Sequence, residues 1–291
     1  FRSEMVASDE ILKRTSDQYR RIRNTFRFIL GNLSDFNDKN KVEFNDQVEL
    51  DKWIINETKV LQKEITALYE SYSYHKATQK IHNFCVNELG GIYLDIVKDR
   101  LYTCKNDSLA RRSCQTSLDF ILNVLVRLIA PILSYTAEEI WQTSDRLNHQ
   151  EKSVFLSNFD TFKIELESSI NQSEWKRIFE IKDAVNQSIE EMRNDNKLKG
   201  SLDSVVNIQA TSNDFQILNK LGDELHFLFI SSEAKVKEGN TFKIKVTTSK
   251  NAKCVRCWHR DLSVGSIQEH PELCNRCIDN IENDGEQRKS V

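Results

Sequence analysis

The chain has 291 residues, of which 39% are hydrophobic, and its formal net charge at pH 7 is −3. This length allows two or three domains with ordinary globular cores, and the slightly acidic balance argues against nonspecific nucleic-acid binding by the whole surface. The longest apolar run, Phe120 to Leu133, is interrupted by Asn123 and Arg127. Because no uncharged run is long enough to cross a bilayer and no signal peptide is recognisable, we expect a soluble protein without a membrane partner.

Known catalytic motifs are missing from the sequence. None of its eight glycines forms G-x-G-x-x-G or G-x-x-x-x-G-K-[ST], and neither G-x-S-x-G nor H-E-x-x-H occurs. We therefore predict no catalytic residue in this chain. Phe1 is an unusual first residue, and we expect the chain to be a fragment of a longer polypeptide.

The first predicted helix begins after Ser8, whose side chain can cap it. Apolar residues recur at spacings of three and four from Thr15 to Leu33 and define its buried face. The opposite face carries these basic and amide residues: Arg20, Arg23, Asn24 and Arg27. Because Asp17 is the only acid within Lys13 to Arg27, we predict a polyanion-binding face, with a solvated charged face as the alternative.

Further apolar stripes predict helices from Leu50 to Tyr72 and from Tyr74 onwards, the latter kinked or broken at Gly90-Gly91. A long helix should begin at Asp107 or Ser108 and be bent or ended by Pro131. Thr136 and Glu139 fit a capping box for a short helix. Residues 1–148 are thus predicted to form an antiparallel helical bundle.

A second group of basic residues falls in the middle of this predicted bundle. Its members are Lys98, Arg100, Lys105, Arg111 and Arg112. Local basic clusters on a mildly acidic protein indicate a specific polyanion partner.

The pattern changes after His149. Ser173 to Met192 predicts an amphipathic helix, and Leu202 to Ala210 and Phe242 to Thr248 alternate like strands. Residues 149–249 should therefore form a small α/β module that joins the bundle to the C-terminal region.

Two C-x2-C motifs in residues 250–291 predict a zinc-binding module. Their four cysteines are Cys254, Cys257, Cys274 and Cys277. This spacing suits one tetrahedral Zn²⁺, and a complete thiolate shell indicates a structural rather than a catalytic ion. His259 and His270 are then expected at the surface or outside the ligand shell. The remaining cysteines, Cys85, Cys104 and Cys114, fall in helical patterns, which favours a reducing, cytoplasmic location.

Trp258 directly follows the second zinc ligand and is flanked by Arg256 and Arg260. A rigid knuckle that presents an indole among cations could stack on an unpaired RNA base, so we predict these three residues as RNA contacts. Packing of Trp258 on a neighbouring domain is the open alternative.

Several motifs, taken in order, resemble one family. They are Tyr19-Arg20-Arg21-Ile22-Arg23-Asn24-Thr25, Tyr93-Leu94-Asp95-Ile96-Val97-Lys98-Asp99-Arg100, Ala110-Arg111-Arg112-Ser113, Ala130-Pro131-Ile132-Leu133-Ser134 and Cys254-Val255-Arg256-Cys257-Trp258-His259. This ordered set resembles the C-terminal anticodon-binding and zinc-binding region of bacterial-type isoleucyl-tRNA synthetases. The resemblance covers nearly the whole chain.

This resemblance implies a class I ligase that attaches isoleucine to its tRNA with ATP and Mg²⁺, in a catalytic domain upstream of Phe1. The present chain would recognise the anticodon stem-loop of isoleucine tRNA as part of a monomeric enzyme. The basic helix face and the zinc-binding turn with Trp258 would then form two walls of a cleft for the loop. Arg111 and Arg112 would bind the phosphates of its stem. Two alternatives remain: a noncatalytic protein-interaction module, and a DNA glycosylase of the formamidopyrimidine type, which has a similar finger but uses an N-terminal proline absent here.

Overall fold

The computed structural model describes residues 7–147, 151–159 and 167–291. Contacts divide the chain into two compact units. The first unit comprises Phe1–Lys39, Ile54–Asp95 and Gln115–Ile164, and the second comprises Asn40–Trp53, Ile96–Cys114 and Glu165–Val291. The three consecutive domains predicted above (1–148, 149–249 and 250–291) stay a prediction. The two contact-based units are not consecutive in the chain, since residues 40–53 and 96–114 group with the later part. None of the helices in the described residues is both long and apolar enough to span a bilayer.

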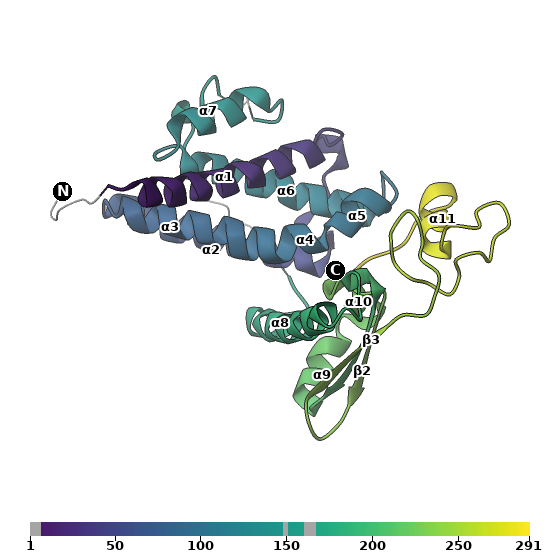
Figure 1. Ribbon diagram of the computed structural model, residues 1–291. Coiled ribbons are helices and arrows are strands. Elements are labelled where there is room, and N and C mark those ends of the chain that lie inside the picture. The colour runs from purple at the N-terminus through teal and green to yellow at the C-terminus, as the bar shows by residue number, and fades with distance from the viewer. Residues whose placement is uncertain (1–6, 148–150, 160–166) are drawn as a thin grey trace. The chain divides into compact units, whose positions relative to one another are not determined.

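Helix α1 (Asp9–Asn32) opens the first unit, and its start was predicted correctly (Figure 1). The hydroxyl of Ser8 accepts a hydrogen bond from the amide of Ile11 at 3.3 Å. The predicted apolar face is buried through Ile22, Phe26 and Ile29. This burial leaves the opposite side of α1 in solvent, where its basic residues lie.

Helices α2 (Glu49–Glu70) and α3 (Tyr74–Phe84) follow, and the boundary between the units lies within α2. Gly90-Gly91, predicted as a kink or a break, lies in a π-helical stretch, Cys85–Tyr93, which continues into α4 (Leu94–Ile96). A Cβ atom on Gly90 would lie 3.0 Å from the carbonyl oxygen of Cys85. Glycine therefore lets the backbone widen without a steric clash. The predicted irregularity is present, as a local widening of a helix that continues rather than as a break.

Helices α5 (Lys98–Thr103), α6 (Leu109–Ile129) and α7 (Ser134–Thr143) follow in the chain. Ser108 caps α6, because its hydroxyl accepts from the Arg111 amide at 3.3 Å, and α6 ends two residues before Pro131 as expected. The capping box at Thr136 was wrong, since α7 begins earlier, at Ser134. The Thr136 hydroxyl lies 3.1 Å from the Tyr19 hydroxyl instead.

The second unit contains a three-stranded sheet in the order β2-β1-β3. Strands β2 and β3 are labelled in Figure 1. Strand β1 (Ser204–Ala210) pairs in parallel with β2 (Glu233–Glu238) and antiparallel with β3 (Lys243–Thr248). Helices α8 (Gln172–Asn194) and α9 (Ser212–Asn219) contact β3 and β2 respectively. The strand β2 was missed in the sequence, as was α10 (Leu225–Leu228).

Short 3-10 turns connect these elements: Asp38–Asn40, Phe44–Asp46, Val154–Leu156, Ser201–Asp203 and Gly222–Glu224. The last helix is α11 (Asn275–Glu282). After it, the chain passes the start of α2, where the Glu49 and Leu50 amides donate to the carbonyls of Lys289 and Ser290 at 3.0 Å. These carbonyls satisfy backbone groups that a helix start leaves without partners.

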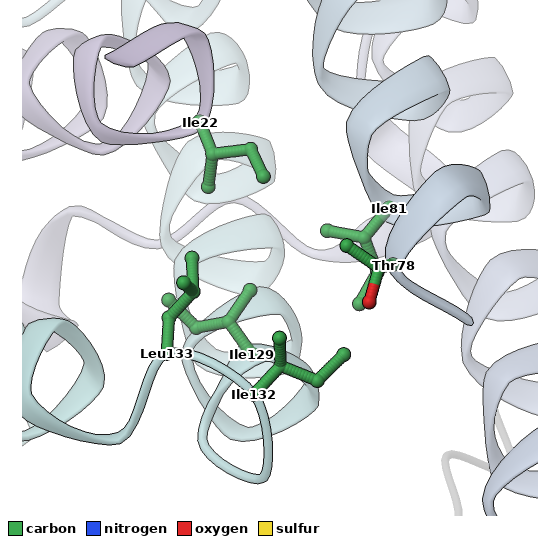
Figure 2. Close-up of a pocket in the computed structure, with 6 residues that line it drawn as sticks. All are labelled: Ile22, Thr78, Ile81, Ile129, Ile132 and Leu133. Atoms are coloured by element: carbon green, nitrogen blue, oxygen red, sulfur yellow. The ribbon is translucent and has the colours of Figure 1, made fainter. Parts of the chain in front are cut away.

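A small cavity in the first unit has almost wholly apolar walls (Figure 2). It is lined by Ile22, Thr78, Ile81, Ile129, Ile132 and Leu133. Its volume of about 10 Å³ is at the lower limit for holding one water molecule, far below the several hundred Å³ typical of ligand pockets. The cavity therefore gives no evidence for a small-molecule site.

Candidate metal centre and RNA-binding surfaces

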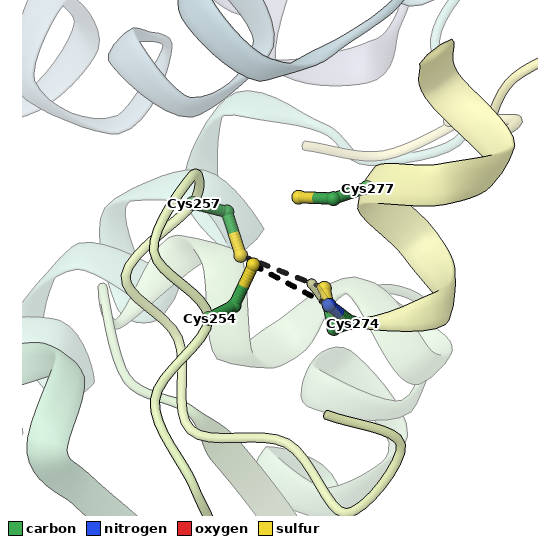
Figure 3. Close-up of side chains that lie close together, drawn as sticks. All are labelled: Cys254, Cys257, Cys274 and Cys277. Carbon is green, nitrogen blue, oxygen red and sulfur yellow. Dashed lines mark hydrogen bonds between the residues drawn. The ribbon is translucent and has the colours of Figure 1, made fainter. Parts of the chain in front are cut away.

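The four predicted zinc ligands come together in the second unit (Figure 3). Their sulfur atoms all lie within 4.8 Å of one another, and the Sγ atoms of Cys257 and Cys274 are 3.7 Å apart. A tetrahedral Zn²⁺ with bonds of about 2.3 Å separates its sulfurs by about 3.8 Å, so the cluster has the size that this ion requires. All four side chains are buried.

The local backbone supports thiolate ligands. Cys274 precedes α11, so Cys277 lies in the first turn of that helix, where unpaired amides favour negative charge. The amide of Cys274 donates to Sγ of Cys254 at 3.4 Å, and Arg256 lies 3.7 Å from Sγ of Cys277. Val264 and Leu273 pack against the sulfurs. The residues present therefore fit a structural zinc with hydrogen-bonded ligands.

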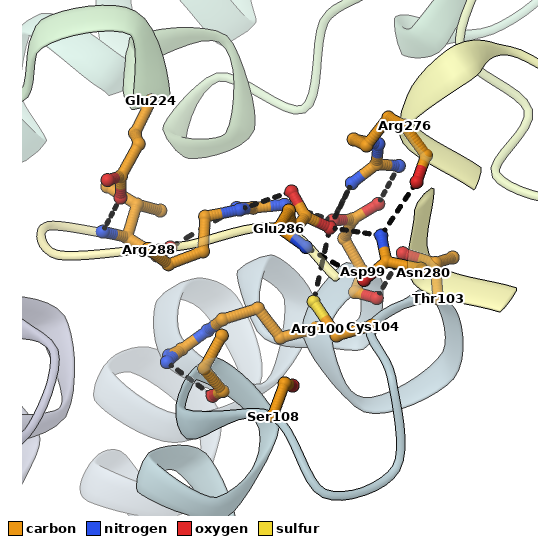
Figure 4. Close-up of polar contacts among 12 residues, drawn as sticks. Asp99, Arg100, Thr103, Cys104, Ser108, Glu224, Arg276, Asn280, Glu286 and Arg288 are labelled. Atoms are coloured by element: carbon orange, nitrogen blue, oxygen red, sulfur yellow. Dashed lines mark hydrogen bonds and ion pairs between the residues drawn. The ribbon is translucent and has the colours of Figure 1, made fainter. Parts of the chain in front are cut away.

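Asp99 on α5 holds the zinc-binding segment within the second unit (Figure 4). Its carboxylate accepts two hydrogen bonds from Arg276, at 2.7 and 2.9 Å, and one from Arg288 at 2.7 Å. Burial acts to raise the pKa of Asp99, but the charges of Arg276 and Arg288 outweigh it and hold that pKa well below its usual range. Asp99 is thus a charged anchor for two arginines.

Glu286 extends the same network (Figure 4). It accepts from Arg276 at 3.1 Å, from Arg288 at 2.8 Å and from the thiol of Cys104 at 3.2 Å. Asn280 on α11 accepts from the backbone amide of Lys105 at 3.1 Å. Arg276 lies between the zinc ligands Cys274 and Cys277 in the sequence. The start of α11 therefore contributes both to the metal centre and to this polar network.

The tryptophan beside the zinc centre is exposed. Trp258 keeps 60% of its surface accessible, and Nζ of Lys253 lies 5.5 Å from its ring centroid. Its backbone is left-handed, with φ of 66°, a conformation that costs a non-glycine residue of the order of 1 kcal/mol or more. A large aromatic residue in such a turn, with most of its ring in solvent, is poorly explained by packing.

The two arginines predicted as RNA contacts near Trp258 are engaged within the protein. Arg256 donates to the carbonyl of Thr103 at 2.5 Å, and Arg260 pairs with Asp203 at 2.6 Å. Both side chains are half-buried. Their roles in RNA binding stay predictions, but their present contacts position the zinc knuckle.

Acidic side chains pair with some of the arginines on the predicted basic face of α1. Arg23 forms two hydrogen bonds with Glu139, at 2.8 and 3.0 Å, and Arg20 pairs with Asp17 at 2.7 Å. Glu139 was not foreseen as a partner, so the expectation of an almost unneutralised face was wrong at Arg23. Arg27 and Asn24 are exposed, and among the described residues Arg27 has no ion-pair partner.

The second basic group is largely structural. Arg100 is 1% exposed and pairs with the buried Asp51 at 2.6 Å, so it does not belong to a surface cluster. Arg111 is half-buried and donates to the carbonyls of Leu101 and Asn106, both at 3.2 Å. Arg112 is half-buried as well. Phosphate binding by Arg111 and Arg112 stays a prediction.

The two histidines near the zinc centre differ in environment. His259 is buried rather than at the surface, and its ring packs edge-on against Phe227 at 5.7 Å between centroids. His270 instead pairs with Glu282 at 2.6 Å. Neither belongs to the four-cysteine cluster, which agrees with their predicted exclusion from the ligand shell.

Comparison with known protein families identifies two regions. Residues 51–208, more than half of the chain, match the family described as the anticodon-binding domain of tRNA ligase. Residues 252–280 match a zinc finger found in FPG and IleRS. This match and the four-cysteine geometry together support a structural zinc. The glycosylase alternative draws support from the finger alone, whereas the first match covers the helical region.

Curated relatives agree with these matches. The chain is 43% identical to the isoleucine–tRNA ligases of Teredinibacter turnerae and Idiomarina loihiensis over 99% of its length, and 41% identical to that of Pectobacterium atrosepticum over all of it. It spans about a third of the length of each relative, 32% in all three. The chain therefore belongs to the family of proteins that contain the anticodon-binding domain of tRNA ligases.

Proposed function

We propose that this chain is the tRNA-binding part of an isoleucine–tRNA ligase and that it recognises the anticodon stem-loop of isoleucine tRNA. Activation of isoleucine with ATP and Mg²⁺ would then occur in a catalytic domain elsewhere in the same polypeptide, which would act as a monomer in the cytoplasm. The observation that carries the proposal is the exposed Trp258 on a zinc knuckle, in a chain that matches the anticodon-binding family.

The chemistry of an anticodon loop suits these surfaces. Its unstacked bases are recognised by aromatic stacking and by hydrogen bonds to base edges, and its phosphates by cations. Trp258 would supply the stacking surface, and Arg27 with Asn24 would supply a cation and an amide. Arg20 and Arg23 would also bind phosphate, which would replace Asp17 and Glu139 as their ion-pair partners. Arg111 and Arg112 would bind phosphates of the stem, and Arg256 and Arg260 would be further RNA contacts beside Trp258.

Replacing Trp258 with alanine should weaken binding of isoleucine tRNA by about 1 to 3 kcal/mol, because one base stack is lost. This corresponds to roughly 5- to 150-fold in Kd, measurable by filter binding. Trp258→Phe should retain most of the affinity, since a ring remains. Trp258→Gly should bind as weakly as the alanine variant without losing stability, because glycine accepts the left-handed backbone without strain.

Leu262 provides the matched control, because its side chain is 86% exposed in the same segment. Leu262→Ala should leave the Kd for tRNA unchanged. If Trp258→Ala binds with wild-type affinity and retains its zinc, the stacking role is wrong. If Trp258→Gly instead lowers the unfolding free energy by several kcal/mol, Trp258 serves folding.

Replacing Arg27 with glutamine should remove about one phosphate contact and so make tRNA binding less dependent on salt concentration. The slope of log Kd against log salt should change by roughly 0.7 to 0.9, because one fewer counterion is released. Arg21→Gln is the control on the same helix: Arg21 is also exposed but lies about 100° around α1 from Arg20. Equal slopes for both variants and the wild type would place Arg27 outside the interface.

A further inference from the structure

The exposed face of the three-stranded sheet bears an array of lysines that the proposed anticodon contacts do not use. Cross-strand pairing places Lys235 and Lys245 on either side of Asn207. The next row places Lys237 and Lys243 on either side of Gln209. Each row therefore reads lysine, amide, lysine across the sheet, and all four lysines are exposed.

The alternation of each strand separates this face from the core. Val206, Ile208 and Ala210 of β1 are buried, whereas Asn207 and Gln209 between them are half-exposed. Since side chains two residues apart share a face, the two rows lie about 7 Å apart along the strands. Lysines within a row are separated by two strand spacings, about 10 Å at the backbone.

The charge of this face is strongly positive. Glu233 lies on the same face and pairs with Lys235. Lys237, Lys243 and Lys245 have no ion-pair partner in the part of the chain that the structure describes. A chain with a formal net charge of −3 thus concentrates unpaired positive charge on one small sheet face, which creates a local positive potential.

The composition of the face indicates which anion it fits. The nine residues that the three strands contribute include no aromatic side chain: Val205, Asn207, Gln209, Glu233, Lys235, Lys237, Lys243, Lys245 and Thr247. Bases could therefore not stack there. A membrane surface would gain little beyond charge, because no large apolar side chain is available to insert. Regularly spaced lysines with amides between them suit the phosphates of a helical RNA stem.

The side chain of Gln209, between the lysines of the second row, is held in position by Thr241 and Gly239. The Gln209 side-chain amide donates to the carbonyl oxygen of Thr241 at 3.2 Å. A Cβ atom on Gly239 would lie 2.5 Å from the Gln209 side chain. Glycine at this position therefore leaves room for Gln209 to lie across the end of the sheet, which fixes one amide between two lysines.

We propose that this face of the β2-β1-β3 sheet binds the phosphate backbone of a tRNA stem independently of sequence. The inference rests on the proposed tRNA-binding function and adds to it a contact that supplies affinity without anticodon discrimination. Contacts to phosphates position a nucleic acid, whereas contacts to base edges specify it.

A triple variant tests this proposal in the full 291-residue, zinc-bound chain. Lys237→Gln, Lys243→Gln and Lys245→Gln together remove three charges from exposed strand positions. The matched control is Lys63→Gln, Lys76→Gln and Lys176→Gln, three exposed lysines of helices α2, α3 and α8. Both proteins should keep their zinc and their circular dichroism, so that charge position is the only difference.

Binding is measured with isoleucine tRNA and with the same tRNA carrying an exchanged anticodon, over a range of salt concentrations. The sheet variant should lower the salt slope by about two to three, while the control keeps the wild-type slope. The ratio of the two affinities should stay at its wild-type value, because the lost contacts are sequence-independent.

A slope equal to that of the control variant would overturn the proposal. So would unchanged tRNA binding together with lost binding to phosphatidylserine vesicles, which would assign the face to a membrane surface. If the wild-type chain binds both tRNAs equally, the anticodon proposal fails, whereas a lower slope for the sheet variant would still support a stem contact.

Discussion

Replacing Cys277 with serine should abolish zinc binding and unfold the zinc-binding segment. Structural zinc contributes of the order of 10 kcal/mol to small modules of this kind, and few apolar side chains surround the four sulfurs to compensate. The bound zinc per chain, measured by atomic absorption, should fall from one ion to nearly none. A strong chelator should produce the same state in the wild-type chain.

The loss should extend beyond the sulfurs. Cys277 lies on α11, which also carries Asn280, the acceptor of the Lys105 amide hydrogen bond. Hydrogen exchange at Lys105 should therefore accelerate in Cys277→Ser. The control is Cys114→Ser, which alters a buried cysteine outside the cluster and should retain the ion. Full zinc content in Cys277→Ser would contradict a four-cysteine site.

Replacing Asp99 with asparagine should destabilise the second unit by about 3 to 5 kcal/mol at pH 7. The carboxylate is the shared partner of Arg276 and Arg288, and its removal leaves Glu286 as the one carboxylate, among the described residues, that pairs with these two largely buried guanidinium groups. Urea unfolding followed by circular dichroism would measure the difference. The effect should be much larger than that of an exposed ion pair, because water cannot replace the lost charge.

Asp107→Asn makes the same chemical change at an exposed site and serves as the control. Asp107 is 74% exposed and lies 3.9 Å from Lys105, so its loss should cost less than about 1 kcal/mol. The Asp99 effect also has a defined pH dependence. Because the pKa of Asp99 is depressed in the folded chain, its stabilisation is present above about pH 4 and is lost as the pH falls below that value. Equal costs for the two variants at pH 7 would contradict the anchoring role.

Local signals made parts of this structure predictable. The start of α1 follows from Ser8, the end of α6 from Pro131, and the zinc ligands from the spacing of four cysteines. Each depends on residues close together in the chain. The π-helical stretch lay at the predicted Gly90-Gly91 irregularity, although its geometry was not foreseen.

Long-range partners explain what could not be predicted. Strand β2 has the sequence Glu-Ala-Lys-Val-Lys-Glu, whose weak apolar pattern becomes a strand only by pairing with β1. Likewise, nothing near Arg100 in the sequence indicates that it is buried against Asp51, 49 residues earlier. One local signal could have predicted the anchoring role of Asp99: it is a lone acid between Lys98 and Arg100. An isolated carboxylate among cations is a candidate anchor for distant arginines.

Recognition of the anticodon is tested most directly by one binding comparison. The zinc-bound chain is titrated with isoleucine tRNA and with the same tRNA in which only the anticodon bases are exchanged, at one moderate salt concentration. We predict at least tenfold tighter binding of the unaltered tRNA, a difference of about 1.4 kcal/mol that a single base contact can supply. Equal affinities for the two tRNAs would contradict anticodon recognition by this chain.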